Sequence, residues 1–261
     1  MPLHHVRLGA GRPLLLVHGL GSTGRSWSPV VQRLAQAREV VAVDLPGHGQ
    51  TPAGPGEATV AGVIEAVERF LDQEGLTGTD AVGASLGGRV VLELARREKV
   101  GAAVALDPGG FWEGWERAYL RTTLGAAATL ARLSGPLLPA LTANPWTRAA
   151  LFAQFSARPV KLPAALAFQE ARSMAETRVF DPLLRDLSYG PAQEGAPPGA
   201  IRSPLAIGWG RGDRVTLPAQ GERAARAFPD ARLHWFEECG HFPHWDRPDE
   251  TVRLILDTVG G

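Results

Sequence analysis

Residues 82–97, VGASLGGRVVLELARR, give the clearest indication of the fold. An apolar run enters a glycine-rich turn, and the turn enters a stretch with apolar residues at helical spacing. Gly83 and Gly87 flank Ser85 as Gly-x-Ser-x-Gly between a predicted strand and a predicted helix. Such a turn lifts the serine hydroxyl clear of a sheet, with glycines where a side chain would collide with strand and helix. Ser85 is therefore a candidate nucleophile, and a glycine-rich turn with an incidental serine is the alternative.

Apolar runs like the one before Ser85 recur along the chain. Near-continuous apolar runs are typical of strands that are buried on both faces, as in a parallel sheet. These runs predict strands within residues 13–19, 39–47, 79–85, 101–110, 203–213 and 231–241.

Helical patterns lie between the predicted strands. Residues 59–75 and 248–259 each place apolar side chains on one stripe, and residues 29–37 open a shorter helix behind Pro29. Strand, helix and strand at this spacing predict an α/β fold: a mostly parallel central sheet with helices on both faces.

One region breaks this alternation. Residues 111–199 hold no good strand run, and alanine- and leucine-rich stretches are cut there by several prolines. We expect four or so short helices that form a cap, or lid, inserted before the last two strands. The core domain would then comprise residues 1–110 and 200–261. A second small domain without a role in the active site is the alternative.

A serine nucleophile needs a base, and the base needs an orienting carboxylate. In sheets of this order the chain sequence is serine, then the acid, then histidine. Asp213 and His241 each follow a predicted strand, where open α/β sheets gather their chemistry. Asp107, after an earlier strand, is a rival acid that we interpret instead as a turn residue bonded to its own loop. His244 is a neighbour that we interpret as structural.

Backbone amides complete the predicted site. The loop His18-Gly19-Leu20-Gly21 directly follows an early strand, and Leu86 opens the helix after Ser85. The Leu20 and Leu86 amides would hold the oxyanion that develops on a substrate carbonyl, and one such donor typically contributes about 2.7–4 kcal/mol.

Together these motifs resemble the α/β-hydrolase superfamily, in its capped branch of esterase-, lactonase- and haloperoxidase-like enzymes. The matching pieces span nearly the whole chain in the family's order: HGLG, DLPGHG, GASLGG, GRGDRVTLP and GHFPHWDRPDE. The resemblance implies a triad of Ser85, Asp213 and His241 and oxyanion amides at Leu20 and Leu86. It also implies roles in fold geometry for His18 and His48. Related dehalogenases and epoxide hydrolases carry aspartate where this chain has serine, so we expect ester-type chemistry.

The expected reaction is hydrolysis of a carboxylic ester of a small to medium uncharged substrate through an acyl-enzyme. The same triad also serves lactone opening, carbon–carbon cleavage of β-diketones, peracid formation, acyl transfer and thioester hydrolysis. A non-catalytic ligand-binding protein on a hydrolase scaffold is the rival from another class. Aromatic side chains of the lid are candidates for the substrate pocket: Phe111, Trp112, Trp146, Phe152 and Phe155.

Composition limits the other partners. Lys plus Arg and Asp plus Glu both number 27, so the formal net charge is zero, which argues against nucleic acid and anionic membrane surfaces. Cys239 is the only cysteine, which excludes an internal disulfide. We expect it to be a small buried loop residue. The N-terminal residues lack the apolar stretch of a signal peptide. We therefore expect a cytoplasmic protein that acts on a small molecule without a cofactor. We expect no metal, because no further ligand cluster joins His241 and His244.

Overall fold

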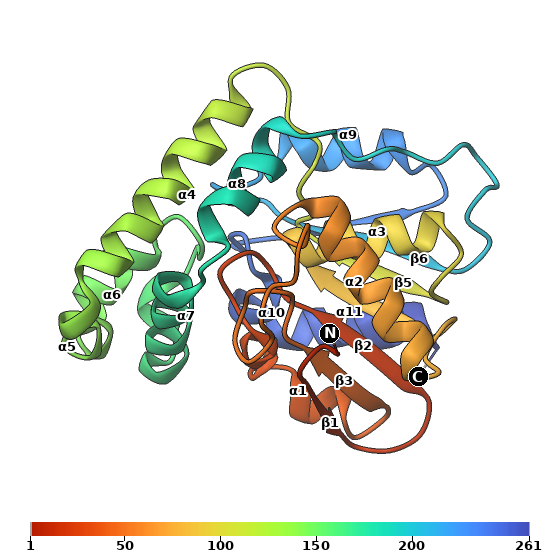
Figure 1. The fold of residues 1–261 in the computed structure, drawn as a ribbon, viewed down its shortest axis with the longest axis horizontal. Helices are drawn as coiled ribbons and strands as arrows, with labels where there is room; N and C mark the ends of the chain where they lie inside the picture. The colour runs from red at the N-terminus through yellow and green to blue at the C-terminus, as the bar shows by residue number, and fades with distance from the viewer. Residues whose placement is uncertain (1, 261) are drawn as a thin grey trace.

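The computed structural model describes residues 2–260, and a seven-stranded sheet forms its centre (Figure 1). The strand order is β1-β3-β2-β4-β5-β6-β7. All neighbouring pairs are parallel except β1 and β3. The strands are β1 (His5–Leu8), β2 (Pro13–Val17), β3 (Glu39–Val43), β4 (Asp80–Ala84), β5 (Ala103–Leu106), β6 (Leu205–Gly210) and β7 (Arg232–Phe236).

The predicted, mostly parallel sheet is confirmed, and each of the six predicted runs contains a strand. Strand β1 was not predicted. It has only four residues, its middle residues are exposed, and it pairs antiparallel with β3 at the edge of the sheet. A strand this short and this exposed carries no apolar run to detect.

Helices cover both faces of the sheet (Figure 1). Helices α2 (Val60–Gln73) and α3 (Leu86–Arg96) pack together on one face, while α1 (Val31–Leu34) and α11 (Pro248–Val259) lie on the other. The predicted apolar stripe of α2 is buried, and the Thr59 side chain caps the helix by accepting a hydrogen bond from the Gly62 amide. Two further helices, α9 (Ala219–Ala227) and α10 (Pro243–Asp246), follow β6 and β7 respectively.

Five α-helices stand between β5 and β6 and gather beside the sheet (Figure 1). We call them the inserted helices: α4 (Glu116–Leu133), α5 (Leu138–Ala143), α6 (Pro145–Phe152), α7 (Ala164–Glu176) and α8 (Phe180–Tyr189). The prediction of four or so short helices was wrong for α4, which runs for 18 residues. Its stretch contains no proline, whereas the later helices are separated by prolines.

Among residues 2–260 no single helix is both long and apolar enough to cross a membrane. Helix α4 meets that test only together with the segment Gly135–Ala143, across a bend of 75°.

The carboxyl ends of the central strands lie level with one another. Ala84 is opposite Leu106, Leu106 is opposite Gly208, and Gly208 is opposite His234. The loops that leave β4, β5, β6 and β7 therefore meet at one edge of the sheet, although they are far apart in the sequence.

Candidate active site

Ser85 occupies the tight turn between β4 and α3. Its backbone has φ 56° and ψ −116°, a conformation that costs energy for any residue with a side chain. A Cβ added to Gly83 would lie 2.0 Å from the Gly87 carbonyl oxygen, and one added to Gly87 would lie 2.1 Å from that of Val17. The prediction that both glycines are sterically required is confirmed. The turn leaves Ser85 partly exposed, while its neighbours in β4 and α3 are buried.

Two backbone amides flank Ser85. Leu86 is the first residue of α3, and Leu20 lies in the loop after β2, where a Cβ on Gly19 would come within 3.1 Å of the Ser85 Cβ. Within the described part of the chain, neither the Leu20 nor the Leu86 amide donates a hydrogen bond to another protein group. The Leu86 amide is at the start of a helix, where amides are free to bind an anion, and the Leu20 amide lies in a loop, so both are available to a ligand.

Two buried histidines fix the loop that carries Leu20. His18 accepts a hydrogen bond from the Leu45 amide at 2.9 Å and lies 2.7 Å from the Gly19 carbonyl oxygen. His48 accepts from the Gly21 amide at 3.1 Å and lies 2.9 Å from the Pro46 carbonyl oxygen. Burial lowers the pKa of both rings, that of His48 to about 3, so both are neutral. Their expected roles in fold geometry are confirmed.

Asp213 and His241 form a buried pair. Asp213 Oδ2 lies 2.8 Å from His241 Nδ1, and the same carboxylate accepts hydrogen bonds from the Val215 amide at 2.7 Å and the Thr216 hydroxyl at 2.6 Å. The carboxylate therefore places the imidazole proton on Nδ1 and leaves Nε2 as an acceptor. Among the described residues, Ser85 Oγ makes no hydrogen bond to His241, but both side chains line one cavity. Such contacts are often long before a substrate binds.

Asp107 lies beside this pair, and the structure corrects its expected role. It does not bond its own loop. Its Oδ1 accepts a hydrogen bond from the Gly210 amide of β6 at 2.8 Å, and its backbone has φ 44°. Burial, and then the negative charge of Asp213, raise the pKa of Asp107 well above its ordinary value. Burial and the charge of Asp213 thus favour the protonated form of Asp107.

Donor atoms of Asp107, Asp213 and His241 all lie within 4.8 Å of one another, the spacing of a possible three-ligand metal site. Asp213 Oδ2 is already engaged by the Thr216 hydroxyl and by His241 Nδ1. A metal ligand must be deprotonated, and burial disfavours the ionised form of Asp107. These three groups are better suited to hold protons than a cation.

The loop that carries His241 packs tightly against residues just after α6. The His241 amide donates a hydrogen bond to the Phe155 carbonyl oxygen at 2.8 Å. A Cβ on Gly240 would lie 2.7 Å from that same oxygen. Glycine at position 240 therefore permits the close approach of two backbone segments.

Asp246 joins the same two segments, and sequence reasoning missed it. Its carboxylate accepts hydrogen bonds from the Gly240 amide at 2.7 Å, the Ala157 amide at 2.8 Å and the Ser156 hydroxyl at 2.5 Å. Asp246 therefore ties the histidine loop to the inserted region.

His244 and Cys239 do not reach the cavity. The His244 ring stacks on Trp27 with the ring centroids 4.3 Å apart, and its Nε2 lies 3.2 Å from the Ser26 hydroxyl. Burial, followed by the charge of His241, lowers the pKa of His244 to about 3. The Cys239 thiol is buried, and burial raises its pKa, so it is unreactive. The structural interpretation of both residues is confirmed.

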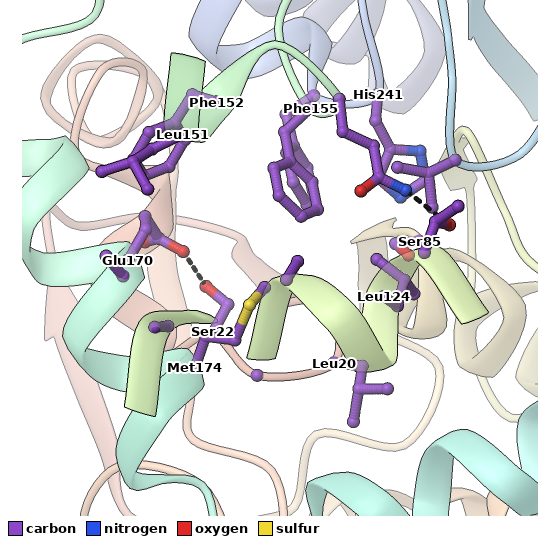
Figure 2. Close-up of a pocket in the computed structure, with 18 of the residues that line it drawn as sticks. Leu20, Ser22, Ser85, Leu124, Leu151, Phe152, Phe155, Glu170, Met174 and His241 are labelled. Atoms are coloured by element: carbon purple, nitrogen blue, oxygen red, sulfur yellow. Dashed lines mark hydrogen bonds between the residues drawn. The ribbon is translucent and has the colours of Figure 1, made fainter. Parts of the chain in front are cut away.

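A cavity of about 370 Å³ opens above Ser85, between the sheet edge and the inserted helices (Figure 2). Of the five aromatic residues predicted to line a pocket, the structure places Trp112, Phe152 and Phe155 on the cavity wall. Phe111 packs edge-to-face against Phe228 instead, with the ring centroids 6.2 Å apart. Trp146 is 78% exposed, because α6 buries the opposite side, which carries Arg148 and Phe152.

Glu170 is a cavity residue that sequence reasoning missed. It is buried, it lines the cavity from α7, and its Oε2 accepts a hydrogen bond from the Ser22 hydroxyl at 2.7 Å (Figure 2). Among the described residues it is the one carboxylate on the cavity wall, so no cluster of acidic residues marks the position. The available signal was its place on the buried stripe of α7, beside Leu166 and Ala167.

Comparisons with known proteins agree with this architecture. The model of the alpha/beta hydrolase family matches residues 14–254. A pimeloyl-[acyl-carrier protein] methyl ester esterase of Aromatoleum aromaticum is 33% identical over 257 residues, covering 95% of this chain and 98% of that protein. A 2-hydroxy-6-oxononadienedioate/2-hydroxy-6-oxononatrienedioate hydrolase of Dechloromonas aromatica is 26% identical, covering 98% of this chain and 90% of that protein.

Solved structures share the fold. An esterase of Thermogutta terrifontis has a TM-score of 0.77 at 21% identity, with coverage of 98% of this chain and 92% of that one. An enol-lactonase of Burkholderia xenovorans has a TM-score of 0.76 at 21% identity, with coverage of 99% and 96%. Because the family model matches residues 14–254, which is nearly the whole chain, this chain belongs to the alpha/beta hydrolase family.

Proposed function

We propose that this protein is a serine hydrolase that cleaves a carboxylic ester of a small to medium uncharged substrate through an acyl-enzyme. One observation carries the proposal. Ser85 is held on a strained turn at the floor of an apolar cavity, and His241, oriented by Asp213, lines the same cavity. An alcohol, a base and an orienting carboxylate are the parts that nucleophilic catalysis by serine requires.

In the first half of the reaction, His241 Nε2 removes the proton from Ser85 as Oγ attacks the ester carbonyl carbon. The negative charge that develops on the carbonyl oxygen is held by the Leu20 and Leu86 amides, which have no partner among the described residues. The protonated imidazole is stabilised by Asp213 and gives its proton to the departing alcohol. An acyl group then remains on Ser85.

In the second half, water takes the place of the alcohol. His241 removes a proton from the water as its oxygen attacks the acyl carbon, and the same two amides hold the second oxyanion. The proton then returns to Ser85 Oγ as the ester bond to the enzyme breaks, which releases the carboxylic acid.

The cavity supports an uncharged substrate. Leucine, alanine and aromatic side chains of α4, α6 and the following segment form most of its wall, so the inserted helices act as a lid that selects the substrate. The 33% identical relative is named as a methyl ester esterase, which supports ester chemistry. The lid extends from the end of β5 to the start of β6, in line with an insertion at residues 111–199.

A fluorophosphonate probe and a panel of p-nitrophenyl esters of increasing acyl length test the proposal. We expect the probe to label the protein and the shorter esters to be hydrolysed. Both signals should vanish in Ser85→Ala and persist in Ser28→Ala, a control at an exposed serine outside the cavity. A folded protein that is neither labelled nor active on any ester of the panel would contradict the proposal and favour a ligand-binding protein.

A further inference from the structure

The wall of the cavity is mostly apolar and includes a few polar side chains. Glu170 and Ser22 form a hydrogen-bonded polar pair on this wall, and Glu170 lies on the far side of the cavity from Ser85 and His241 (Figure 2). Glu170 is the one carboxylate among the described residues that line the cavity. The reaction proposed above uses neither Glu170 nor Ser22.

The Glu170 carboxyl has unused capacity for hydrogen bonding. Its Oε2 accepts from the Ser22 hydroxyl at 2.7 Å, while Oε1 has only a long contact of 3.4 Å with the Gln169 side chain. A buried carboxyl group that is only partly satisfied costs free energy, so it favours a ligand that supplies the missing partner.

The surroundings of Glu170 favour a neutral ligand group. Burial raises the pKa of Glu170 to about 7, although the hydrogen bonds from the Ser22 and Gln169 side chains act to lower it. A ligand carboxylate would be repelled by the ionised form of Glu170. An ammonium group would lose its hydration between apolar walls. A hydroxyl group can donate to Glu170 when the side chain is ionised, and donate or accept when it is neutral.

Ser22 also belongs to the loop that presents the Leu20 amide. The Ser22 amide donates a hydrogen bond to the Gly19 carbonyl oxygen at 3.2 Å. Gly21 fits directly against α8, since an added Cβ would lie 2.7 Å from the Phe180 ring. Glu170 and Ser22 therefore join α7 to this loop, and their positions are fixed relative to Ser85.

We propose that Glu170, oriented by Ser22, is a specificity-determining residue that hydrogen-bonds a hydroxyl group on the part of the substrate remote from the ester. The substrate class is thus a hydroxylated aliphatic ester with an apolar middle. This inference rests on the proposed ester hydrolysis for its reaction, but the hydroxyl site itself can be tested without turnover.

The first experiment compares p-nitrophenyl esters of ω-hydroxy acids with the matching unsubstituted esters, from butanoate to dodecanoate. The readout is the ratio of kcat/KM for each pair. At the chain length that reaches Glu170, we expect the wild type to favour the hydroxylated ester by about tenfold, the effect of one good hydrogen bond. Glu170→Gln should keep most of this preference. Glu170→Leu should reverse it, because an apolar wall penalises an unpaired hydroxyl.

The matched control is Glu176→Leu, on the same helix but exposed and paired with Arg172. It should keep the wild-type ratio. Thermal unfolding and fluorophosphonate labelling establish that each variant is folded, and Glu170→Met serves as a second apolar variant should Glu170→Leu not fold. A wild-type ratio at or below one at every chain length would overturn the inference. An unchanged ratio in the apolar variant would also overturn it. So would a higher kcat/KM for the matching ω-amino ester than for the ω-hydroxy ester.

The second experiment measures binding to Ser85→Ala, with methyl esters that cannot be cleaved by it. Methyl ω-hydroxyalkanoates should bind more tightly than the unsubstituted methyl esters, and Glu170→Leu in the same background should remove the difference. This separates the two proposals. Hydroxyl selection without any ester hydrolysis would contradict the proposed function alone, whereas hydrolysis without hydroxyl selection in either experiment would contradict the role of Glu170 alone.

Discussion

Ser85 stores strain in the folded state. A positive φ with ψ −116° is accessible to glycine and costly for other residues, at about 1–3 kcal/mol. We therefore expect Ser85→Gly to abolish ester hydrolysis and to raise the free energy of unfolding. The expected gain is roughly 1 kcal/mol after the larger chain entropy of unfolded glycine is subtracted.

Urea denaturation measures this change, and Ser85→Ala is the matched control. Alanine removes the hydroxyl but keeps the Cβ, so it should also abolish hydrolysis while gaining none of this stability. Equal stability of the glycine and alanine variants would show that the turn is not strained.

The two acids beside His241 should differ sharply in effect. Asp213 contacts the imidazole directly, and an asparagine there would present an amide group to Nδ1 and disturb the tautomer that leaves Nε2 free. We expect Asp213→Asn to lower kcat by about a thousandfold or more. The Asp107 carboxyl hydrogen-bonds the Gly210 amide rather than the imidazole, so Asp107→Asn should lower kcat by less than about tenfold, a difference that steady-state assays resolve. The opposite order would reassign the orienting acid to Asp107.

Glu170 should make stability depend on pH. Its pKa rises from an ordinary value of 4.5 to about 7 through burial, so folding favours the protonated form. Stability is highest below the unfolded pKa, where the group is neutral in both states, and is lost as the pH rises through about 7.

Glu170→Gln cannot ionise, so the stability of this variant relative to wild type should rise by roughly 3 kcal/mol between about pH 4 and about pH 8.5. Chemical denaturation at the two pH values measures the difference. Glu176→Gln, at an exposed position, should show almost none. A Glu170→Gln curve parallel to that of wild type would mean that Glu170 titrates as it does in water.

Among the elements, the histidine loop depends on the inserted region. Asp246 accepts hydrogen bonds from the Gly240 amide and from two groups just after α6, and an asparagine would direct an N–H₂ group at some of these donors. We expect Asp246→Asn to lose about 2–3 kcal/mol of stability. It should also lower kcat more than it changes KM, because the position of His241 becomes less defined. Asp249→Asn, exposed on the neighbouring helix, should change neither quantity.

The same elements show what the sequence could predict. Buried strands such as β4 and β5 are continuous apolar runs, and α2 is a regular apolar stripe, so both kinds of element were found. Strand β1 has no residue in the buried class and so carries no apolar run, and the length of α4 was underestimated because prolines interrupt the rest of this region. In the site, Ser85, Asp213 and His241 stand in recognisable local motifs. Glu170 and Asp246 form hydrogen bonds with Ser22 and Ser156, which are far away in the sequence. No local sequence motif predicts such contacts.

At the scale of the whole molecule, the sheet brings the three predicted triad residues together. Ser85 follows β4, Asp213 follows β6 and His241 follows β7, and the parallel register brings the ends of these strands to one edge. The inserted helices then enclose that edge and supply most of the cavity wall. The sheet thus places Ser85, Asp213 and His241, while the inserted helices shape the cavity before them.

The proposed reaction requires that Ser85 becomes acylated. Rapid mixing of the protein with p-nitrophenyl acetate, followed by acid quenching and peptide mass mapping, tests it most directly, because p-nitrophenolate leaves easily and the acyl-enzyme should accumulate. We expect a burst of p-nitrophenolate equal to the amount of protein, with a single acetyl group on the peptide that contains Ser85. A burst with the acetyl group on another residue, or turnover that continues undiminished in Ser85→Ala, would contradict it.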